Sequence, residues 1–212
     1  MKDNPRVLIV IGSPKNRAST SGFLAGYIKR KLEIKKVKVE LKCAYSLLGS
    51  SKGINELFRL LKIADHLMVI SPLYVDSLPW GLTKSLEEIL KNKSRLMLHK
   101  KSISAIINCG FPEPEHNLLA LDICRCFAQK AGMRWIGAVM IGNGEEVRGR
   151  DTHLIKSPQG DVKKALDVIA DCIRRNDVFQ IKHLTHKMIL NCNELVLLNG
   201  INIMVQQNDN FN

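Results

Sequence analysis

Hydroxyl side chains gather in one short segment near the start of the chain. Residues 12–21 read GSPKNRASTS. The segment contains four hydroxyl side chains, Ser13, Ser19, Thr20 and Ser21, and Lys15 adds a positive charge. A helix is predicted to begin near the end of this segment, and its first turn would offer unpaired backbone N–H groups and a positive dipole end to an anion. Capping that helix needs one hydroxyl rather than four. The segment therefore predicts a phosphate site, although its spacing matches neither G-x-x-x-x-G-K-S/T nor G-x-G-x-x-G.

A second segment could hold a flat ring. Residues 71–80 read SPLYVDSLPW, in which two prolines flank Tyr74 and keep the chain stiff and non-helical. Such a segment can present backbone groups and an apolar wall to an aromatic ligand. Tyr74 or Trp80 alone would more often be a half-buried side chain with its polar tip at the surface. A third segment, 108–116, contains Gly110, which permits close backbone approach.

Five apolar runs alternate with five helical patterns and must position these segments. The runs span 7–11, 36–42, 67–70, 103–107 and 135–141. The helical patterns place apolar residues three and four positions apart over 23–32, 54–61, 82–90, 119–127 and 162–173. Strands that alternate with helices predict a parallel sheet with helices on both faces.

The second apolar run differs from the others and indicates the order of the strands. Residues 36–42 alternate strictly between apolar and charged side chains, which is typical of a strand with one solvated face. The first, third and fourth runs are continuously apolar, as in strands covered on both faces. A doubly wound sheet of order 2-1-3-4-5 places the second strand at an edge, and its ligand lies beyond the carboxyl ends of strands one and three. The segments 12–21 and 71–80 follow those two strands.

Two stretches fall outside this pattern. Residues 142–160 show no clear periodicity and are longer than most structureless loops, so we expect them to border the ligand pocket or a contact between subunits. Residues 177–212 form a C-terminal extension of the domain 1–176. Their apolar spacing favours a mostly helical extension, with a hairpin over Asn199-Gly200 as the alternative. Either form must pack on the domain or on a second subunit.

Length and composition narrow the class of protein. The 212 residues, 45% hydrophobic and 25% charged, suit one α/β domain with an appendage. No run of 18 apolar residues and no signal-peptide pattern occurs, and the six cysteines are irregularly spaced, so we expect a cytoplasmic protein with reduced thiols and no membrane span. The net charge of +12 suits an anionic small molecule. No nucleic-acid motif accompanies it, so we expect no nucleic-acid partner.

Three segments at the predicted strand ends together resemble one family. GSPKNRASTS, PLYVDSLP and NCGFPE resemble the NADPH-dependent FMN reductase group of flavodoxin-like proteins, over about residues 6–176. The resemblance implies a flavodoxin-like α/β fold with five parallel strands in the order 2-1-3-4-5. It also implies an FMN-dependent oxidoreductase that takes hydride from NADPH or NADH and passes electrons to a small acceptor such as a quinone, a nitro compound or free flavin. A homodimer or homotetramer is the expected assembly.

The resemblance implies cofactor-binding residues in all three segments. Around the phosphate these are Ser13, Lys15, Ser19, Thr20 and Ser21. Against the isoalloxazine they are Pro72, Leu73, Tyr74 and Val75, and at its pyrimidine end Asn108, Cys109, Gly110 and Phe111. No catalytic side chain is expected, because the flavin itself would carry the chemistry.

Other residues that could do chemistry have simpler interpretations. Cys124 and Cys126 would point to different faces of a helix, and His183 and His186 share a face but lack a third ligand, so no metal is expected. His116 could meet a nicotinamide but is more often a surface histidine.

Two other functions fit the same motifs. One is a flavodoxin-type electron carrier without a nicotinamide site, although such carriers are generally acidic and this chain is basic. The other is a non-catalytic flavodoxin-like binding module.

Overall fold

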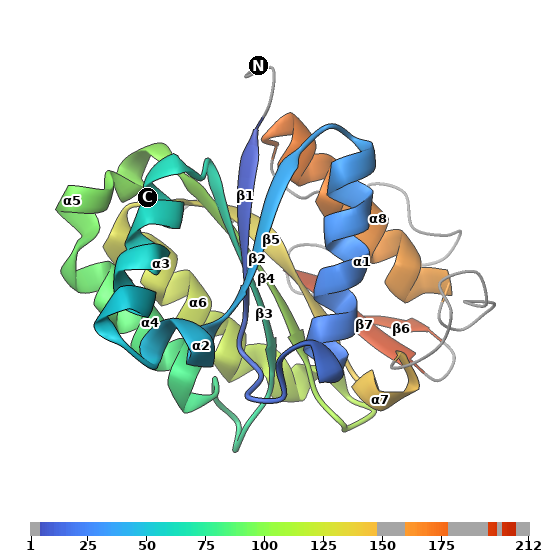
Figure 1. The fold of residues 1–212 in the computed structure, drawn as a ribbon. Coiled ribbons are helices and arrows are strands. Elements are labelled where there is room, and N and C mark those ends of the chain that lie inside the picture. The colour runs from blue at the N-terminus through green and yellow to red at the C-terminus, as the bar shows by residue number, and fades with distance from the viewer. Residues whose placement is uncertain (1–4, 148–159, 178–194, 199–200, 207–212) are drawn as a thin grey trace.

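Seven strands form one sheet through the middle of the molecule, in the order β2-β1-β3-β4-β5-β7-β6 (Figure 1). This computed structural model describes residues 5–147, 160–177, 195–198 and 201–206. The first five strands in the chain are parallel, and they are β1 (Arg6–Ile11), β2 (Lys38–Cys43), β3 (His66–Pro72), β4 (Ser102–Asn108) and β5 (Arg134–Ile141). The predicted parallel order 2-1-3-4-5 is confirmed.

Helices cover both faces of the sheet (Figure 1). One face is covered by α1 (Thr20–Ile34) and α8 (Gly160–Arg175). The other is covered by α2 (Ala44–Leu48), α3 (Ser51–Ile63), α4 (Trp80–Lys91), α5 (Lys93–Leu96) and α6 (Leu118–Ala131). Four short helices lie in the loops: η1 (Asn16–Ala18), η2 (Leu98–Lys100), η3 (Pro114–Asn117) and α7 (Gly144–Val147). Among the described residues, no helix combines the length and the apolar character needed to cross a membrane.

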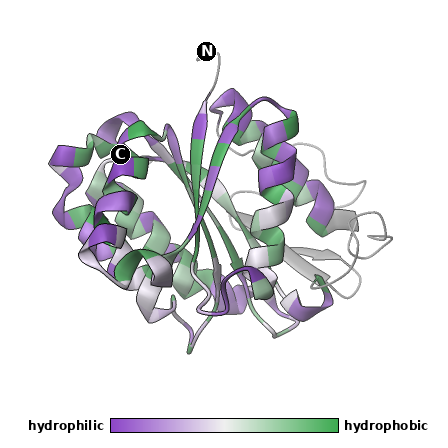
Figure 2. Cartoon of the chain, in the orientation of Figure 1, coloured by the Kyte–Doolittle hydropathy of each residue, from purple (hydrophilic) through white to green (hydrophobic). Residues whose placement is uncertain are grey.

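The sheet separates two apolar cores. Alternate residues of β1 face opposite sides, so that Ile9 packs with the α1 and α8 core and Leu8 with the core on the α3 side. Both side chains are almost fully buried, as the continuous apolar run predicts. Figure 2 shows the same division, with hydrophobic strands inside and hydrophilic residues on the outer sides of the helices.

The edge strand and the helix ends follow the sequence pattern. In β2, Lys38 and Glu40 are exposed while Val39 between them is buried, which confirms the predicted solvated face. Ser50 caps α3, where its Oγ accepts a hydrogen bond of 3.1 Å from the backbone N–H of Gly53. Gly132 ends α6 with a φ of 69°, a left-handed conformation that glycine adopts without strain.

The C-terminal extension differs from the expected helix. Over 195–206 the structure has two antiparallel strands, β6 (Leu195–Leu198) and β7 (Ile201–Gln206), and β7 pairs antiparallel with β5. The helical prediction is therefore wrong for these residues, and the alternative of a hairpin holds for them. Ile201, Ile203 and Val205 recur at a period of two and are β-branched, which favours a strand. Residues 178–194, with His183 and His186, lie outside the described residues.

Candidate functional site

A cavity of about 220 Å³ opens at the carboxyl edge of the sheet, between the loops that follow β1, β3, β4 and β5. Its lining residues are Ser13, Lys15, Ser19, Thr20, Ser21, Pro72, Leu73, Tyr74, Asn108, Cys109, Gly110, Gly144 and Glu145. All the predicted cofactor-binding residues except Val75 and Phe111 are among them. The loops 12–21 and 71–80 thus lie at one pocket, as the strand order predicts.

Ser19 caps the first helix and has no hydroxyl proton left to donate to a ligand. Its Oγ accepts a hydrogen bond of 3.0 Å from the Gly22 N–H and donates one of 2.5 Å to the carbonyl oxygen of Asn16. The backbone N–H of Phe23 bonds to the Ser19 carbonyl, so the cap leaves the N–H groups of Thr20 and Ser21 for a ligand. For Ser19, the capping role describes its side chain better than phosphate binding does.

Gly22 allows the preceding turn to fold against the helix. A Cβ at this position would lie 2.5 Å from both the Asn16 carbonyl oxygen and the Arg17 Cα. Only glycine therefore permits η1 to pack so closely on the first turn of α1. This packing fixes the loop that carries Ser13 and Lys15.

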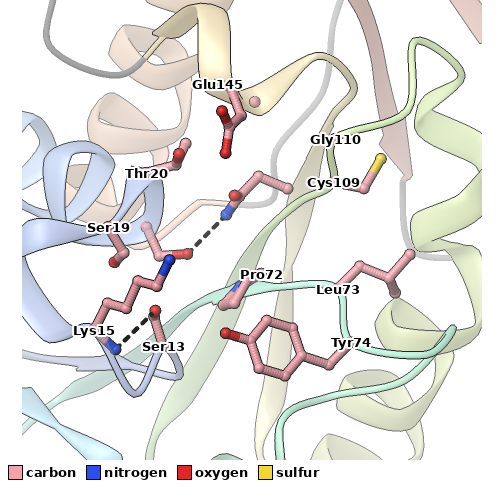
Figure 3. Close-up of a pocket in the computed structure, with 13 residues that line it drawn as sticks. Ser13, Lys15, Ser19, Thr20, Pro72, Leu73, Tyr74, Cys109, Gly110 and Glu145 are labelled. Carbon is pink, nitrogen blue, oxygen red and sulfur yellow. Dashed lines mark hydrogen bonds between the residues drawn. The ribbon is translucent and has the colours of Figure 1, made fainter.

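Ser13 lies at the base of this loop and is almost fully buried. Its Oγ accepts a hydrogen bond of 3.3 Å from the backbone N–H of Lys15, as the dashed line in Figure 3 shows. The side chain of Lys15 is exposed at the edge of the pocket. One buried hydroxyl and one exposed cation thus lie beside the start of α1.

Asn108, the last residue of β4, connects three of the loops. Its Nδ2 donates to Ser21 Oγ at 2.8 Å and to the Ser71 carbonyl oxygen at 2.9 Å. Its own carbonyl accepts from the Leu73 N–H at 2.8 Å. Asn108 therefore holds three elements together around the cavity: the start of α1, the end of β3 with the loop after it, and the end of β4.

Pro72, Leu73 and Tyr74 form the wall after β3 (Figure 3). The chain then reverses, because Tyr74 and Ser77 exchange backbone hydrogen bonds of 2.9 and 3.0 Å. Val75 lies at the tip of this turn with a φ of 48° and is 98% exposed, which removes it from the pocket. Two-residue turns of this kind need positive φ, so the turn geometry decides where Val75 points.

Phe111 and His116 lie together outside the pocket. Phe111 is 54% exposed, and its ring centroid lies 4.5 Å from that of His116. His116 is itself exposed and lies 3.9 Å from a carboxylate oxygen of Glu113. The surface interpretation of His116 therefore fits the structure, and Phe111 is not where its expected role would need it.

Gly144 and Glu145 line the pocket but were not singled out from the sequence. They belong to α7, directly after β5, and Figure 3 shows the Glu145 side chain pointing toward the cavity. The available signal was their place after the fifth strand, at the same edge of the sheet. The stretch 142–160 is predicted to border the pocket or a contact between subunits, and two of its described residues, Gly144 and Glu145, line the pocket. Residues 148–159 lie outside the described residues.

The thiol of Cys109 is buried and lies among polar groups. Asn117 Nδ2 donates to its Sγ at 3.3 Å, and the carbonyl oxygens of Phe111, Glu113 and Ile141 lie 3.6 to 3.8 Å from that sulfur. Burial raises the pKa of Cys109 above that of a free thiol. No group of three His, Cys, Asp or Glu side chains within the described ranges could hold a metal ion.

This chain resembles known proteins in its three-dimensional structure. No protein-family model matches the sequence. A search of curated proteins finds no match either. Among solved structures, an apo NADH:FMN oxidoreductase is similar, with 20% identity, 84% of this chain and 92% of that chain covered, and a TM-score of 0.61.

Two further structures are similar to a comparable degree. FerB from Paracoccus denitrificans, a flavoenzyme NAD(P)H:(acceptor) oxidoreductase, has 12% identity, coverage of 81% of this chain and 96% of that chain, and a TM-score of 0.59. A putative quinone reductase from Klebsiella pneumoniae has 13% identity, coverage of 80% and 85%, and a TM-score of 0.55. The chain therefore has the flavodoxin-like fold, and its structure is similar to those of NADH:FMN and NAD(P)H:acceptor oxidoreductases.

Proposed function

We propose that the protein is an FMN-dependent NAD(P)H oxidoreductase that passes electrons to a small acceptor. The observation that carries the proposal is the cavity at the carboxyl edge of the sheet, where hydroxyls at the start of α1 face a stiff apolar wall after β3. Those two features suit the two ends of one ligand, an anionic phosphate and a flat ring.

The donor set at the start of α1 fits a phosphate. Among the described residues, no acceptor takes the hydroxyl protons of Ser13 or Thr20, and both residues line the cavity. The N–H groups of Thr20 and Ser21 and the positive end of the helix dipole add to them. Lys15 supplies a charge at the rim. We assign Ser13, Lys15, Thr20 and the first turn of α1 to the phosphate, and keep Ser19 as the cap.

The wall after β3 fits a planar ring. Pro72 and Leu73 offer an apolar surface, and Tyr74, 42% exposed, can cover one edge of a ring. Asn108, Cys109 and Gly110 also line the cavity. When bound there, FMN would accept a hydride from NADPH or NADH and supply electrons to the acceptor. The protein residues orient the ring and leave the cavity open for a second molecule.

The acceptor belongs to the class of small oxidised molecules such as quinones, nitro compounds or free flavin. Two of the similar structures, a putative quinone reductase and an NAD(P)H:(acceptor) oxidoreductase, support this class. In this proposal, residues 1–176 bind FMN, and 177–212 pack on them or on a second subunit of a cytoplasmic homodimer or homotetramer.

An absorption spectrum of the purified protein, before and after incubation with FMN, tests the cofactor. We expect bound oxidised flavin, and anaerobic addition of NADH or NADPH should bleach its band, which a small quinone should then restore. Bound flavin that neither nucleotide bleaches would instead favour a flavodoxin-type carrier. A colourless protein that takes up no FMN would favour a non-catalytic module, and either result overturns the proposed activity.

A further inference from the structure

A basic surface lies at the amino edge of the sheet, away from the cavity. Residues 89–112 contain no Asp or Glu, and the basic residues Lys93, Arg95 and Lys100 lie in the first half of this stretch, on α5 and η2. These two short helices directly precede β4, so they lie at the amino ends of the strands, whereas the cavity lies at the carboxyl ends. Figure 1 shows α5 and α7 at opposite ends of the molecule.

Hydrogen bonds join the ends of two longer helices to this segment. Lys93 Nζ donates to the Lys130 carbonyl oxygen at 3.0 Å, which places the end of α6 beside α5. The buried Lys101 Nζ donates to the carbonyl oxygens on either side of Ile63, at 3.1 and 2.6 Å, which places the end of α3 there as well. The amino-edge surface, as we call it, therefore contains the exposed cations Lys62, Lys93, Arg95, Lys100 and Lys130.

Acidic side chains do not neutralise the amino-edge surface. On the α1 side of the sheet, by contrast, Lys35 Nζ lies 2.6 Å from a carboxylate oxygen of Asp171. Within the part of the chain that the structure describes, none of the five cations forms an ion pair with a carboxylate. The nearby Asp65 accepts a hydrogen bond of 3.0 Å from the backbone N–H of Arg6 instead. The surface is therefore a positively charged region that attracts anions.

Two apolar side chains lie among these cations. Met97 is 48% exposed and Ile63 is 42% exposed. Met97 has a φ of 49°, a left-handed conformation that is uncommon for a residue other than glycine. Its neighbours Leu96 and Leu98 are buried in the core on the α3 side and anchor the turn on both sides. The buried leucines thus hold Met97 outward between the cations.

Cations around exposed apolar side chains match the interface of an anionic lipid bilayer. There the cations meet the negative headgroups, while the apolar side chains enter the boundary with the acyl chains. Specific protein partners use interfaces of about 800 Å² per side with centres that are poor in charge, unlike this surface. Nucleic-acid phosphates would attract the cations but offer Met97 and Ile63 no apolar partner.

We propose that the amino-edge surface docks the protein reversibly on anionic lipid bilayers. This inference goes beyond the proposed function and does not depend on it. A protein docked in this way has the cavity at its far end, open to water. Docking should therefore leave the affinity for FMN unchanged.

Sedimentation of the full-length protein with sucrose-loaded vesicles tests the proposal. One set of vesicles is phosphatidylcholine alone, and the other contains about one third phosphatidylserine. At about 0.1 M NaCl we expect at least ten-fold stronger binding to the anionic vesicles, and at about 0.5 M NaCl this preference should be lost. Equal binding to both sets, or binding to neither, would overturn the proposal.

Two variants separate the charges from the apolar contact. Combining Arg95→Gln, Lys100→Gln and Lys130→Gln should weaken binding to anionic vesicles by at least about ten-fold. Met97→Asn keeps every charge, and asparagine tolerates the left-handed backbone. It should weaken the same binding by about three-fold or more, because the apolar side chain no longer enters the bilayer.

Three other cations provide the matched control. Arg30, Lys38 and Lys52 are exposed on α1, on β2 and in the first turn of α3, and none of them lines the cavity. Their combined replacement by Gln removes the same net charge and should leave more than half of the binding. An equal loss in this control would show that the total charge of the protein, rather than the amino-edge surface, attracts the vesicles.

Duplex DNA distinguishes a lipid surface from a general polyanion site. If Met97→Asn binds anionic vesicles as well as the unaltered protein, and a short DNA duplex binds with the same salt dependence, docking on lipid is overturned. Thermal melting shows whether each variant is folded, and if the triple variant is not, Arg95→Gln alone should still weaken vesicle binding by about three-fold or more. Titration with FMN is done in parallel, because a failure of lipid docking leaves the proposed oxidoreductase activity standing.

Discussion

His66 Nε2 lies 2.8 Å from Ser104 Oγ, across the pairing of β3 with β4. The other ring nitrogen, Nδ1, lies 2.8 Å from Ser102 Oγ, so both nitrogens of the buried imidazole have hydroxyl partners. One hydroxyl can donate to the unprotonated nitrogen while the other accepts from the protonated nitrogen, and together they satisfy the neutral ring. Burial, and then the charge of Arg134, lowers the pKa of His66 to about 3. The sheet therefore holds a neutral histidine at the end opposite the pocket.

The first prediction is a loss of stability as the pH falls below about 6.5. Below that value the unfolded chain binds a proton at His66, whereas the folded protein does not until the pH approaches 3, so protons favour unfolding. This one group contributes a slope of up to about 1.4 kcal/mol per pH unit to the free energy of unfolding. His66→Gln removes that slope, although it also lowers stability at pH 7. Urea unfolding at pH 7, 6 and 5 measures the slope.

His99 provides the comparison for this experiment. It is exposed on η2, and His99→Gln should keep the slope of the unaltered protein. A His66→Gln protein with an undiminished slope between pH 7 and 5 would show that other groups cause the pH dependence.

The parallel part of the fold follows from the sequence because burial leaves a direct pattern. A strand covered on both faces must be apolar throughout, as β1 is, and an edge strand can alternate, as Lys38, Val39 and Glu40 do. These two patterns, with one helix after each strand, leave few topologies open. The order of five strands could therefore be predicted without any contact information.

The form of the C-terminal extension and the roles of the pocket serines depend on contacts between residues that are distant in the sequence. Residues 195–206 contain both helical and alternating apolar spacing, and the pairing of β7 with β5 decides between them. In the pocket, Ser19 and Ser21 look equivalent in the sequence, but one bonds to Asn16 and Gly22 nearby and the other to Asn108, 87 positions away. Residue type predicts that a hydroxyl is present. Its partners determine what it can bind.

The second prediction concerns two cysteines of one helix. Cys126 is exposed on α6, whereas Cys124 is fully buried and burial raises its pKa to about 12. Alkylation needs an accessible thiolate, so iodoacetamide at pH 8 should label Cys126 first and leave Cys124 and Cys109 unlabelled. Peptide mass mapping after a time course measures this order, and urea should expose all three thiols. Labelling of Cys109 as fast as Cys126 would show that the pocket thiol is reactive.

The third prediction introduces a charge beside the proposed phosphate site. Ser13 is 2% exposed and lines the pocket, so Ser13→Asp would place a carboxylate where little water can screen it. Repulsion should weaken FMN binding by at least about ten-fold, and riboflavin, which has no phosphate, should lose much less. Fluorescence titration with both flavins measures the difference. Ser94→Asp adds the same charge on exposed α5 and should change neither affinity.

An equal loss for FMN and riboflavin in Ser13→Asp would mean that the variant distorts the loop. An unchanged affinity for FMN would mean that the phosphate does not lie beside Ser13.

The fourth prediction compares two glycines one turn apart in α1. A Cβ at Gly22 would lie 2.5 Å from backbone atoms of the preceding turn, which cannot move without breaking the Ser19 cap. Gly22→Ala should therefore lower the free energy of unfolding by about 1 kcal/mol or more, the typical contribution of a cap. It should also weaken FMN binding, because the loop that carries Ser13 and Lys15 is displaced from the helix.

Gly26→Ala should have the opposite effect on stability. A Cβ there would meet only a guanidinium nitrogen of Arg30, at 3.9 Å, so alanine fits without displacement. Alanine is the better helix former by about 0.5–1 kcal/mol, and Gly26→Ala should raise the free energy of unfolding by up to that amount while leaving FMN affinity unchanged. Urea unfolding and FMN titration of the two variants side by side measure both effects. Two equally stabilised variants with unaltered FMN affinity would show that η1 does not need to pack on α1 to form the site.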